Sequence, residues 1–520
     1  MEFWAPNNLQ QITGGRWLTP PPSGLAVRGL SIDSRTIEAN QVFLAVEGQR
    51  FDGHDFLAPA AKAGAGLLIV SRHDRVPLGE VAVLQVDDSV KALHDLAQTY
   101  RDLLKTAKTK VIAVVGSNGK TTTRHLIHAV LSAKFRGTQS PKSFNNHLGL
   151  PLTLLAASPA DDFVVAELGT NHPGEIETLA KLARPDAAVI PNLDEEHLEF
   201  FADLAGVVEE EAAVLKWIPK GGPAFLEARA FATLQLCNRL PDDLQAMVYG
   251  CGPDDRCQIT WSDRELIDGG HGQAFGVNGG LKIKLPLLGR HNVDNAVAAV
   301  AVGRWLEVPD LHIASVLKNV KGVPMRLQVQ RCGDPSRPEP QIMVVNDAYN
   351  ANYPSMVEAL RTLASMPLAN PANRRIAILG DMLELGPAGP QRHRDLVHHL
   401  AIECKNRERL AARCSQPTEP GEDGGSNPAV FLQDGTALPS PPLPGIAKAI
   451  LIGPLAGLTA EALQHHWSAD RIHAFHDWTD HLPGTVANLL RPGDVVLIKG
   501  SRGMGLERLI PAIEKRMQKR

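Results

Sequence analysis

The chain has 520 residues, 44% of them hydrophobic, and its 53 Lys and Arg against 57 Asp and Glu leave a formal charge of −4. At roughly 150 residues per domain, this length predicts about three domains, each with enough apolar side chain for its own core. The near-neutral charge excludes a polybasic protein and makes nucleic acid an unexpected partner, and 5% aromatic residues argue against base-stacking surfaces.

The sequence contains no segment typical of a membrane protein or a secreted one. No run of apolar residues approaches the 18 that predict a membrane span. Residues 1–8 lack the basic and apolar regions of a secretory signal. The six cysteines form no C-x-x-C pair, which favours free thiols. We therefore expect a cytoplasmic protein without a membrane span.

Residues 1–105 predict a small α/β domain. Its apolar strand at 42–46 is followed by a turn-rich segment at 47–54 and then by an Ala-rich helical stretch. The polar segment 105–110 predicts a linker. The pattern changes after it, so a second domain is expected over 106–325.

Short β-branched runs alternate with helical periods in this second domain. Strands are predicted at 111–115, 163–166 and 187–190, and a helix from Thr121 to about Lys134. This alternation indicates a parallel sheet covered by helices. Ligands of such sheets bind at the carboxyl ends of the strands.

Residues 326–520 contain a second α/β series and predict a Rossmann-like C-terminal domain. Its candidate strands are 342–345, 376–379, 449–452 and 495–498. Between them, 15 of the 31 residues at 415–445 are Pro, Gly or Ser. Such a composition cannot supply a packed core, so this segment predicts a flexible surface insertion.

A phosphate-binding loop is the strongest chemical signal in the sequence. It lies between the strand at 111–115 and the following helix, and consists of Gly116, Ser117, Asn118, Gly119, Lys120, Thr121 and Thr122. Glycines let backbone N–H groups curl around an anion at a helix N-terminus. The lysine can neutralise phosphates, and the Thr121 hydroxyl can bind Mg²⁺. The alternative is a glycine-rich turn that only caps the helix, because the loop is two residues shorter than the general form.

Two further candidates for the metal follow the next predicted strands. Glu167 ends the strand at 163–166, and His197 follows the strand at 187–190. A carboxylate is the expected Mg²⁺ ligand, and an imidazole can complete or orient the shell. Alternatively, both residues are solvated groups at strand ends.

These segments, together with 288–295 (L-G-R-H-N-V-D-N), resemble the Mur ligases. Mur ligases are ATP-dependent, amide-forming enzymes of peptidoglycan precursor synthesis. Other segments resemble the family member that joins D-alanyl-D-alanine to a UDP-N-acetylmuramoyl-tripeptide; they are 33–35, 52–56, 143–152, 169–176, 346–352, 379–386 and 499–504. The resemblance covers nearly all of the chain outside 415–445.

The resemblance implies that ATP phosphorylates the tripeptide carboxylate and that the dipeptide amine then attacks the acyl phosphate. Two anions meet in the first step, so a cation and Mg²⁺ are needed to stabilise the transferring phosphoryl group. The resemblance gives these roles to Lys120, Thr121, Glu167 and His197.

The resemblance also implies contacts with the rest of ATP. Asn292 and Asn295 would contact the adenine, although the residue type of Asn292 alone favours a helix N-cap. Arg326 would bind a phosphate as a forked cation. Asp347 would accept hydrogen bonds from the ribose hydroxyls.

The remaining implied contacts are with the long nucleotide-sugar substrate. Ser34 and Arg35 would hold its uridine diphosphate end, although the three residues at 33–35 alone suggest only a turn. Asn145 and Asn146 would bind the same substrate, or they tie down their own loop.

A basic turn at the end of the last predicted strand carries Lys499, Ser501 and Arg502. The resemblance makes it a site for a substrate carboxylate or phosphate. Without it, a solvated basic turn is the favoured interpretation.

One position departs from the family. Mur ligases usually carry a lysine that is carbamylated, and ungapped counting from His197 places Glu211 there. We hypothesise that Glu211 is a carbamate-free acidic substitute, directly or through a bridging water. The alternative is that 209–211 forms a solvated acidic helix face. Lys216 lies five residues further on and is expected to face elsewhere.

The sequence and the resemblance together predict a three-domain, monomeric ligase that uses ATP and Mg²⁺. Two alternatives stay open. One is another amino-acid ligase of the superfamily, either of the folylpolyglutamate type or adding the third residue; the chain lacks the D-N-P-R-type motif of the latter. The other is a catalytically silent nucleotide-binding homologue. The third residue of the tripeptide, diaminopimelate or lysine, is not determined by the sequence.

Overall fold

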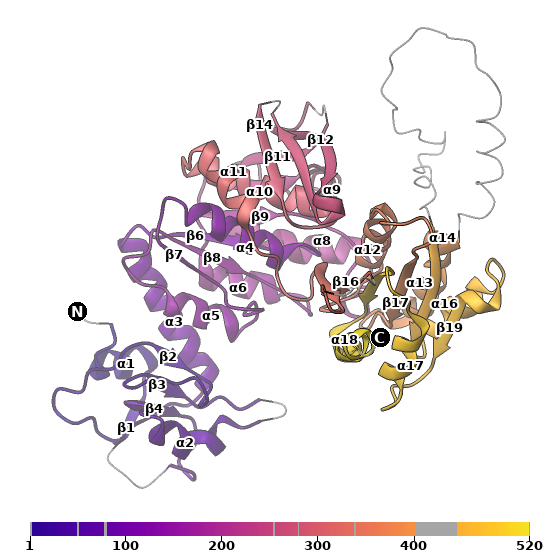
Figure 1. The fold of residues 1–520 in the computed structure, drawn as a ribbon. Coiled ribbons are helices and arrows are strands. Elements are labelled where there is room, and N and C mark those ends of the chain that lie inside the picture. Colours follow the sequence, from indigo (N-terminus) through magenta and orange to yellow (C-terminus); the bar gives the residue numbers. More distant parts are fainter. Residues whose placement is uncertain are drawn as a thin grey trace.

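The computed structural model describes residues 3–48, 51–76, 81–252, 255–278, 280–336, 340–401 and 445–518. They form three α/β bodies, each built around one sheet, which follow one another along the chain (Figure 1). The predicted insertion at 415–445 lies outside the described residues, apart from Gly445.

The N-terminal body contains a five-stranded sheet of order β1-β5-β4-β3-β2. The pair β1–β5 is antiparallel and the other pairs are parallel. Its strands are β1 (Arg16–Thr19), β2 (Leu30–Ser31), β3 (Val42–Leu44), β4 (Leu67–Val70) and β5 (Ala82–Gln85), and its helices are α1 (Pro6–Thr13), the 3₁₀ turn η1 (Gly53–Phe56), α2 (Leu57–Lys62) and α3 (Ser89–Thr106).

Helix α3 connects the first body to the second. The Asp88 side chain caps its N-terminus by accepting hydrogen bonds from Val90 N and Lys91 N. The helix ends at Thr106 and β6 begins at Lys110, so the linker predicted at 105–110 is wrong in extent: only 107–109 separate the two elements. The apolar face of α3 overrode the polar composition of its last turn, because Leu104 is fully buried.

The central body contains a nine-stranded sheet of order β14-β13-β12-β11-β10-β9-β6-β8-β7. Strands from β7 to β12 pair in parallel, and β13 and β14 add an antiparallel edge. The strands are β6 (Lys110–Val114), β7 (Gly137–Gln139), β8 (Phe163–Glu167), β9 (Ala187–Ile190), β10 (Pro223–Glu227), β11 (Gln245–Cys251), β12 (Ile259–Ile267), β13 (Gly272–Val277) and β14 (Leu281–Leu285).

Helices cover both faces of this sheet. Along β6, Val111 and Ala113 face one apolar core and Ile112 and Val114 face the other, as a strand buried on both sides requires. The helices are α4 (Lys120–Leu131), α5 (Gly149–Ala156), α6 (Glu175–Ala183), α7 (Leu198–Phe201), α8 (Leu204–Ala212), α9 (Ala228–Leu236), α10 (Arg290–Trp305) and α11 (Asp310–Asn319), with the 3₁₀ turns η2 (Ala213–Trp217) and η3 (Asp268–Gly270).

The C-terminal body contains a six-stranded sheet of order β15-β16-β20-β17-β18-β19, parallel except for β15. Its strands are β15 (Gln328–Cys332), β16 (Ile342–Asp347), β17 (Arg375–Gly380), β18 (Ile446–Ile452), β19 (Ile472–Phe475) and β20 (Val495–Lys499). Its helices are α12 (Tyr353–Ser365), α13 (Gly389–Asp395), α14 (Val397–Ala401), α16 (Ala456–Leu463), α17 (Leu482–Leu489) and α18 (Ile510–Gln518), with η4 (Gly386–Ala388), η5 (Ala469–Arg471), η6 (Arg502–Met504) and η7 (Leu506–Leu509).

This architecture confirms the predicted fold class: three α/β bodies, with a mostly parallel central sheet and a Rossmann-like C-terminal sheet. The boundaries predicted at 105/106 and 325/326 stay predictions. Among the described residues, no helix combines the length and apolar character needed to cross a membrane.

Candidate active site

The phosphate loop joins β6 to α4 at the carboxyl edge of the central sheet. Gly116 and Gly119 have positive φ, of 108° and 86°. A Cβ would lie 2.5 Å from Asn192 O at the first and 2.7 Å from Asn295 Oδ1 at the second. Both positions therefore require glycine for their backbone angle and for their close packing.

Two backbone amides of the loop are used by the protein itself. Gly116 N donates to Glu211 Oε2 over 2.7 Å, and Ser117 N donates to Asn192 O over 3.1 Å. The Ser117 hydroxyl donates to Asp194 O over 2.7 Å. The expected anion cradle is thus shorter than residues 116–122, and the first turn of α4 supplies its remaining amides.

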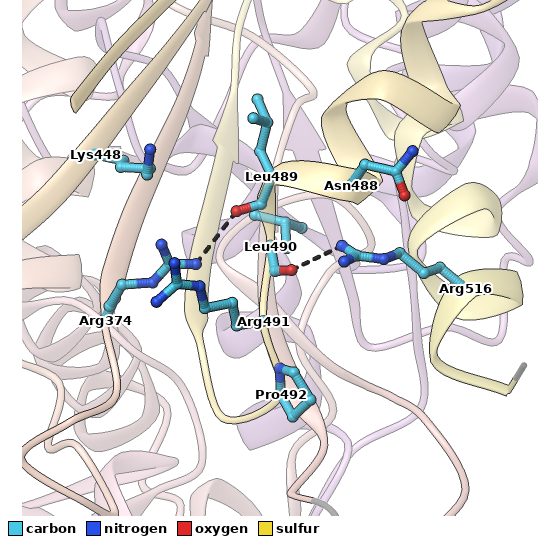
Figure 2. A pocket seen from close by; sticks show the side chains of 8 residues that line it. All are labelled: Arg374, Lys448, Asn488, Leu489, Leu490, Arg491, Pro492 and Arg516. Carbon is cyan, nitrogen blue, oxygen red and sulfur yellow. Dashed lines mark hydrogen bonds between the residues drawn. The ribbon is translucent and has the colours of Figure 1, made fainter. Parts of the chain in front are cut away.

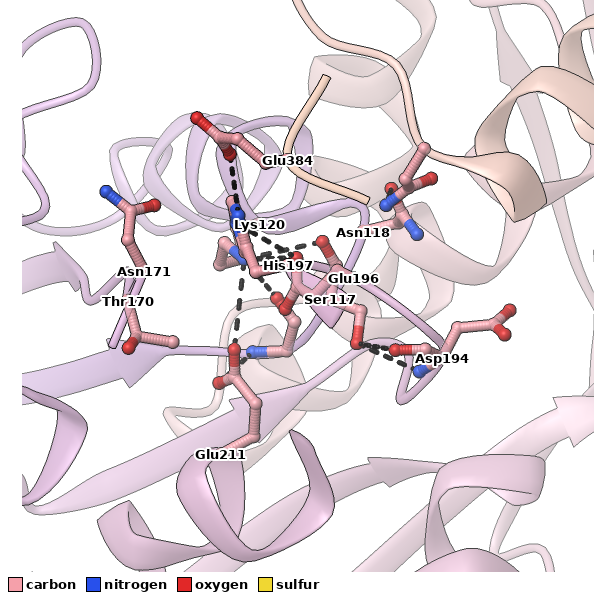
Figure 3. A network of polar contacts seen from close by, with 12 residues as sticks. Ser117, Asn118, Lys120, Thr170, Asn171, Asp194, Glu196, His197, Glu211 and Glu384 are labelled. Atoms are coloured by element: carbon pink, nitrogen blue, oxygen red, sulfur yellow. Dashed lines mark hydrogen bonds and ion pairs between the residues drawn. The ribbon is translucent and has the colours of Figure 1, made fainter. Parts of the chain in front are cut away.

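Lys120 lies between two buried carboxylates (Figure 3). Its Nζ donates to Gly116 O and lies 3.6 Å from Glu196 Oε2 and 3.9 Å from Glu211 Oε1. Burial disfavours its charged form, but the negative charges of Glu196 and Glu211 outweigh burial and raise the pKa of Lys120. The side chain is a permanent cation held beneath the loop.

Glu196 is a site residue that the sequence analysis missed. Its side chain is 4% exposed, and its Oε1 accepts no hydrogen bond from the described residues. Burial raises its pKa well above the ordinary value; the charge of Lys120 acts in the opposite direction, and Glu211 adds to the rise. Its place directly before His197, beyond the end of β9, was the available signal.

Thr121 and Glu167 lie together, as predicted. The Thr121 hydroxyl donates to Glu167 Oε1 over 3.0 Å, and Asn145 Nδ2 donates to the same oxygen over 3.1 Å. Glu167 Oε2 is buried without a hydrogen-bond donor, although Arg124 Nε lies 3.3 Å away. A buried carboxylate oxygen beside a threonine hydroxyl is a donor set that suits Mg²⁺.

His197 takes a left-handed backbone conformation, with φ 46°, and contacts the C-terminal body. Its Nδ1 lies 2.8 Å from Glu384 Oε2, and its Nε2 lies 3.8 Å from Glu196 Oε2. A hydrogen bond from His197 lowers the pKa of Glu384. In the described part of the chain, no three His, Cys, Asp or Glu side chains form a metal-binding group. A metal role for His197 stays a prediction.

Asn292 and Asn295 lie in the first turns of α10, and Asn295 contacts the first turn of α4. Thr123 Oγ1 donates to Asn295 Oδ1 over 3.1 Å, and Asn295 Nδ2 donates to Asn292 Oδ1 over 2.9 Å. The N-cap of α10 is Gly289, and Asn292 Nδ2 instead donates to Leu288 O over 2.6 Å. The N-cap interpretation of Asn292 is therefore wrong; adenine contact stays a prediction.

Arg326 reaches the loop from the start of the C-terminal body. Its Nη2 donates to Thr121 Oγ1 over 2.9 Å. Its guanidinium lies 4.4 Å from the ring centre of Tyr349, which holds the fork in place by a cation–π contact.

Asp347 and Lys499, assigned from the sequence to two different ligands, form one ion pair. Lys499 Nζ donates to Asp347 Oδ2 over 2.7 Å and to Asn350 O over 2.9 Å. Asp347 Oδ1 accepts from Leu327 N over 3.0 Å. These two residues end the neighbouring parallel strands β16 and β20, at paired positions, so their charges neutralise each other.

The predicted basic turn is not a single solvated cluster. Lys499 and Ser501 are buried, and the Ser501 hydroxyl accepts from Leu383 N over 2.9 Å. Arg502 is exposed and pairs with Glu507 at 2.7 Å. The solvated interpretation is therefore wrong for two of the three residues, and their binding of a substrate anion stays a prediction.

The N-terminal candidates lie in a local turn. Arg35 pairs with Asp33 at 2.7 Å, and hydrogen bonds from Arg35 lower the pKa of Asp33 to about 2. Ser34 is half-buried between them. These contacts match the turn interpretation and leave uridine diphosphate binding a prediction.

The two neighbouring asparagines have different partners. Asn146 Oδ1 accepts from Leu148 N over 3.2 Å and from Gly149 N over 2.9 Å at the start of α5, so it ties down its loop. Asn145 instead directs its side-chain amide to the predicted metal ligand Glu167.

The acidic run at 209–211 is not a solvated face. Glu211 is fully buried at the loop, and Glu210 accepts from Gly174 N and Ile176 N, over 2.6 and 2.7 Å, at the start of α6. Of the three residues, Glu209 alone faces solvent and pairs with Arg239 at 3.1 Å. Lys216 lies near Glu177, at 3.8 Å, so it faces elsewhere as expected.

Further contacts join the C-terminal body to the central body, and sequence reasoning did not single them out. Asn352 Nδ2 donates to Asn118 Oδ1 over 3.1 Å. The hydroxyls of Tyr349 and Ser143 are hydrogen-bonded, and Arg392 pairs with Glu195. The segments 143–152 and 346–352 contained Ser143, Tyr349 and Asn352, whereas nothing in the sequence indicated Arg392.

Comparison with known proteins identifies this arrangement. The model of the Mur ligase family, catalytic domain, matches residues 26–101; the Mur ligase middle domain matches 114–303; the Mur ligase, glutamate ligase domain, matches 326–411. The UDP-N-acetylmuramoyl-tripeptide–D-alanyl-D-alanine ligase of Bacillus subtilis is 31% identical over 505 residues, 97% of this chain and 96% of the relative. The chain belongs to the Mur ligase family. The family predicted from the sequence is thus confirmed, and with it the class of enzyme, a ligase.

Two further comparisons agree with the assignment of this chain to the Mur ligases. The ligase of the same name from Escherichia coli is 33% identical over 365 residues, 70% of this chain and 76% of the relative. The crystal structure of MurF from Acinetobacter baumannii superposes with a TM-score of 0.77 and 27% identity, covering 98% of this chain and 99% of the other. The three-body fold is that of this solved structure.

Proposed function

We propose that this Mur ligase joins D-alanyl-D-alanine to a UDP-N-acetylmuramoyl-tripeptide with hydrolysis of ATP to ADP and phosphate. The observation that carries the proposal is a cation, Lys120, fixed under a glycine loop beside the Thr121–Glu167 pair. The similarity over almost the whole length to relatives with this activity in their names supports the choice of substrates.

In the first step, an oxygen of the tripeptide carboxylate attacks the γ-phosphorus of ATP, and ADP leaves. Lys120 and the first-turn amides of α4 stabilise the phosphoryl charge. Arg326, held by Tyr349 at the Thr121 hydroxyl, brings a second cation to the same point. In the second step, the dipeptide amine attacks the acyl carbon, phosphate leaves, and the amine loses a proton.

Mg²⁺ fits the oxygen donors of Thr121 and Glu167, and when bound it screens the repulsion between the triphosphate and the carboxylate. Asn145 donates to Glu167 and so orients this carboxylate. Asn295 accepts from Thr123 on α4 and donates to Asn292, and these two asparagines are the candidates to contact the adenine. We expect the enzyme to act as a monomer in the cytoplasm.

The test is substrate-dependent ADP release. The wild-type chain should release ADP only when UDP-muramoyl-tripeptide and D-alanyl-D-alanine are both present, and Lys120→Ala should abolish this release. The exposed control Lys181→Ala, on α6, should leave it unchanged. Full activity of Lys120→Ala would remove the assignment of the loop.

A substrate panel separates the alternatives. Turnover with a single amino acid in place of the dipeptide, or with a folate acceptor, would indicate another ligase of the superfamily. ATP binding with no amine-dependent turnover would indicate a silent homologue.

Glu211 is proposed as the anionic partner of Lys120 that the family usually obtains from a carbamylated lysine. Three observations support this: Glu211 is fully buried, its Oε1 lies 3.9 Å from Lys120 Nζ, and its Oε2 binds Gly116 N. A glutamate is charged without CO₂, so ligation should not depend on bicarbonate.

A further inference from the structure

A basic pocket lies in the C-terminal body, away from the residues described so far. Its volume is about 440 Å³. Of the eight residues that line it, four are cationic and none is acidic; the cations are Arg374, Lys448, Arg491 and Arg516 (Figure 2). Asn488 adds an amide at the end of α17.

The pocket lies at the amino ends of the parallel strands of the C-terminal sheet, whereas Asp347 and Lys499 of the candidate active site lie at the carboxyl ends. Arg374 directly precedes β17, Lys448 lies near the start of β18, and Arg491 precedes β20. The starts of these parallel strands lie side by side, with Arg375 paired to Ile446 and to Val495. Lys499 ends β20, five residues after Asp494, which is about 16 Å of extended chain. The pocket is therefore a separate site.

Side chains that line the pocket are oriented by the protein. Asp494, with a side chain 1% exposed, pairs with Arg374 over 2.6 and 3.0 Å. Carbonyl oxygens hold two others: Arg516 Nη1 donates to Leu490 O over 2.7 Å, and Lys448 Nζ donates to Asp470 O over 2.5 Å.

Asp494 offsets the charge of Arg374, whereas the carbonyl oxygen of Asp470 orients Lys448 without cancelling its charge. Burial lowers the pKa of Lys448; the charges of Arg374 and Arg491 act in the same direction, and those of Asp470 and Asp494 oppose them. Arg374 and Arg491 both line the pocket (Figure 2). Like charges gathered in this way favour an anion between them.

We propose that this pocket binds a small soluble molecule that carries phosphate groups. Guanidinium forks match phosphate oxygens in pairs, and the lysine adds a point charge. The volume lies within the range of small-molecule pockets, about 300–1,000 Å³. It exceeds the space needed for one phosphate ion, so a diphosphate or a phosphorylated metabolite is the expected class.

The experiment is calorimetric titration of the full chain with pyrophosphate, in a Lys120→Ala background that removes the main cation of the nucleotide loop. The pocket variant is Lys448→Ala/Arg491→Ala. The control variant Lys62→Ala/Lys181→Ala removes two exposed charges on α2 and α6, outside the C-terminal body. Pyrophosphate should bind in a 1:1 ratio, and the pocket variant should bind it at least tenfold more weakly, whereas the control should match the parent.

Two further measurements complete the test. With Lys120 restored, the pocket variant should keep wild-type ligase turnover, which shows that the protein is folded. Vesicles of phosphatidylglycerol test a lipid headgroup as the alternative source of phosphate. No measurable pyrophosphate binding, an equal loss in the control, or binding of vesicles but not of pyrophosphate would each overturn the proposal.

Discussion

The substitution Glu211→Gln tests the charge arrangement of the site most directly. It keeps an oxygen that can accept from Gly116 N and removes only the negative charge 3.9 Å from Lys120 Nζ. At an effective dielectric constant of about 20, two unit charges at this distance interact by about 4 kcal/mol. The charge of Glu196 opposes part of this gain, because it repels Glu211.

We expect about a third of that energy, roughly 1.4 kcal/mol, to appear in the activation barrier. This corresponds to a tenfold lower rate. The assay is steady-state ADP release with both substrates at saturation. The control is Glu209→Gln, two positions earlier on α8, because Glu209 faces solvent and pairs with Arg239; its rate should be unchanged.

The companion variant Glu211→Lys places a second ammonium beside Lys120. It should be inactive without bicarbonate, and added bicarbonate should restore activity if the lysine forms a carbamate and recovers the negative charge. The wild-type rate should not respond to bicarbonate. Wild-type rates for both Glu211→Gln and Glu211→Lys would refute a role of this charge in catalysis.

Three further predictions concern stability, measured by urea unfolding. Tyr249→Phe should leave the free energy of unfolding unchanged or raise it by up to about 1 kcal/mol, because the buried hydroxyl has no hydrogen-bond partner among the described residues; a larger loss would contradict this. Burial, and then the charge of Glu227, raises the pKa of Asp294 from 3.8 to about 6. The folded chain therefore binds this proton more tightly than the unfolded chain does. The protonated carboxyl stabilises the folded chain below about pH 4, and this contribution to the free energy of unfolding, at most about 3 kcal/mol, is lost as the pH rises through 6. In Asp294→Asn this fall should be absent, and an unaltered pH profile would count against it. Asp494→Asn should cost about 3 kcal/mol, because it leaves Arg374, 15% exposed, without its bidentate partner; a cost below 1 kcal/mol would show that solvent replaces the pair.

The sequence predicted best what depends on local pattern and on the ends of strands. The loop at 116–122 follows a strand buried on both faces, and β8 ends at Glu167, next to β6 in the sheet. Parallel pairing alone brings this carboxylate to the Thr121 hydroxyl. Seven of the fifteen strands of the two larger sheets were predicted, each to within a few residues, for the same reason; β7, β10 to β14, β15 and β19 were not predicted.

Contacts between the bodies could not be predicted from the sequence. Nothing in a one-dimensional pattern shows that Glu384 meets His197, since their positions are almost 190 residues apart in the chain. The interpretation of 209–211 as a solvated helix face was wrong for a related reason. Three adjacent glutamates share a sequence signal, but α8 directs one to solvent, one to the start of α6 and one to the phosphate loop. Neighbours on a helix surface are three or four residues apart, so adjacent residues take different environments.

The balance of charge explains why three glutamate carboxylates are buried close together at the phosphate loop. As whole residues, Glu167, Glu196 and Glu211 are 0–3% exposed, and Lys120 and Arg124 lie within 4 Å of their carboxylate oxygens. Burying a carboxylate without a counter-charge is costly, and a stable core would replace it with apolar residues. Arg326 adds a third cation at the Thr121 hydroxyl, and each of the three carboxylates has one buried oxygen that accepts no hydrogen bond from the described residues. Such oxygens suit a divalent cation, whose charge would offset part of that of a bound triphosphate, so the site is electrostatically suited to take up the two together.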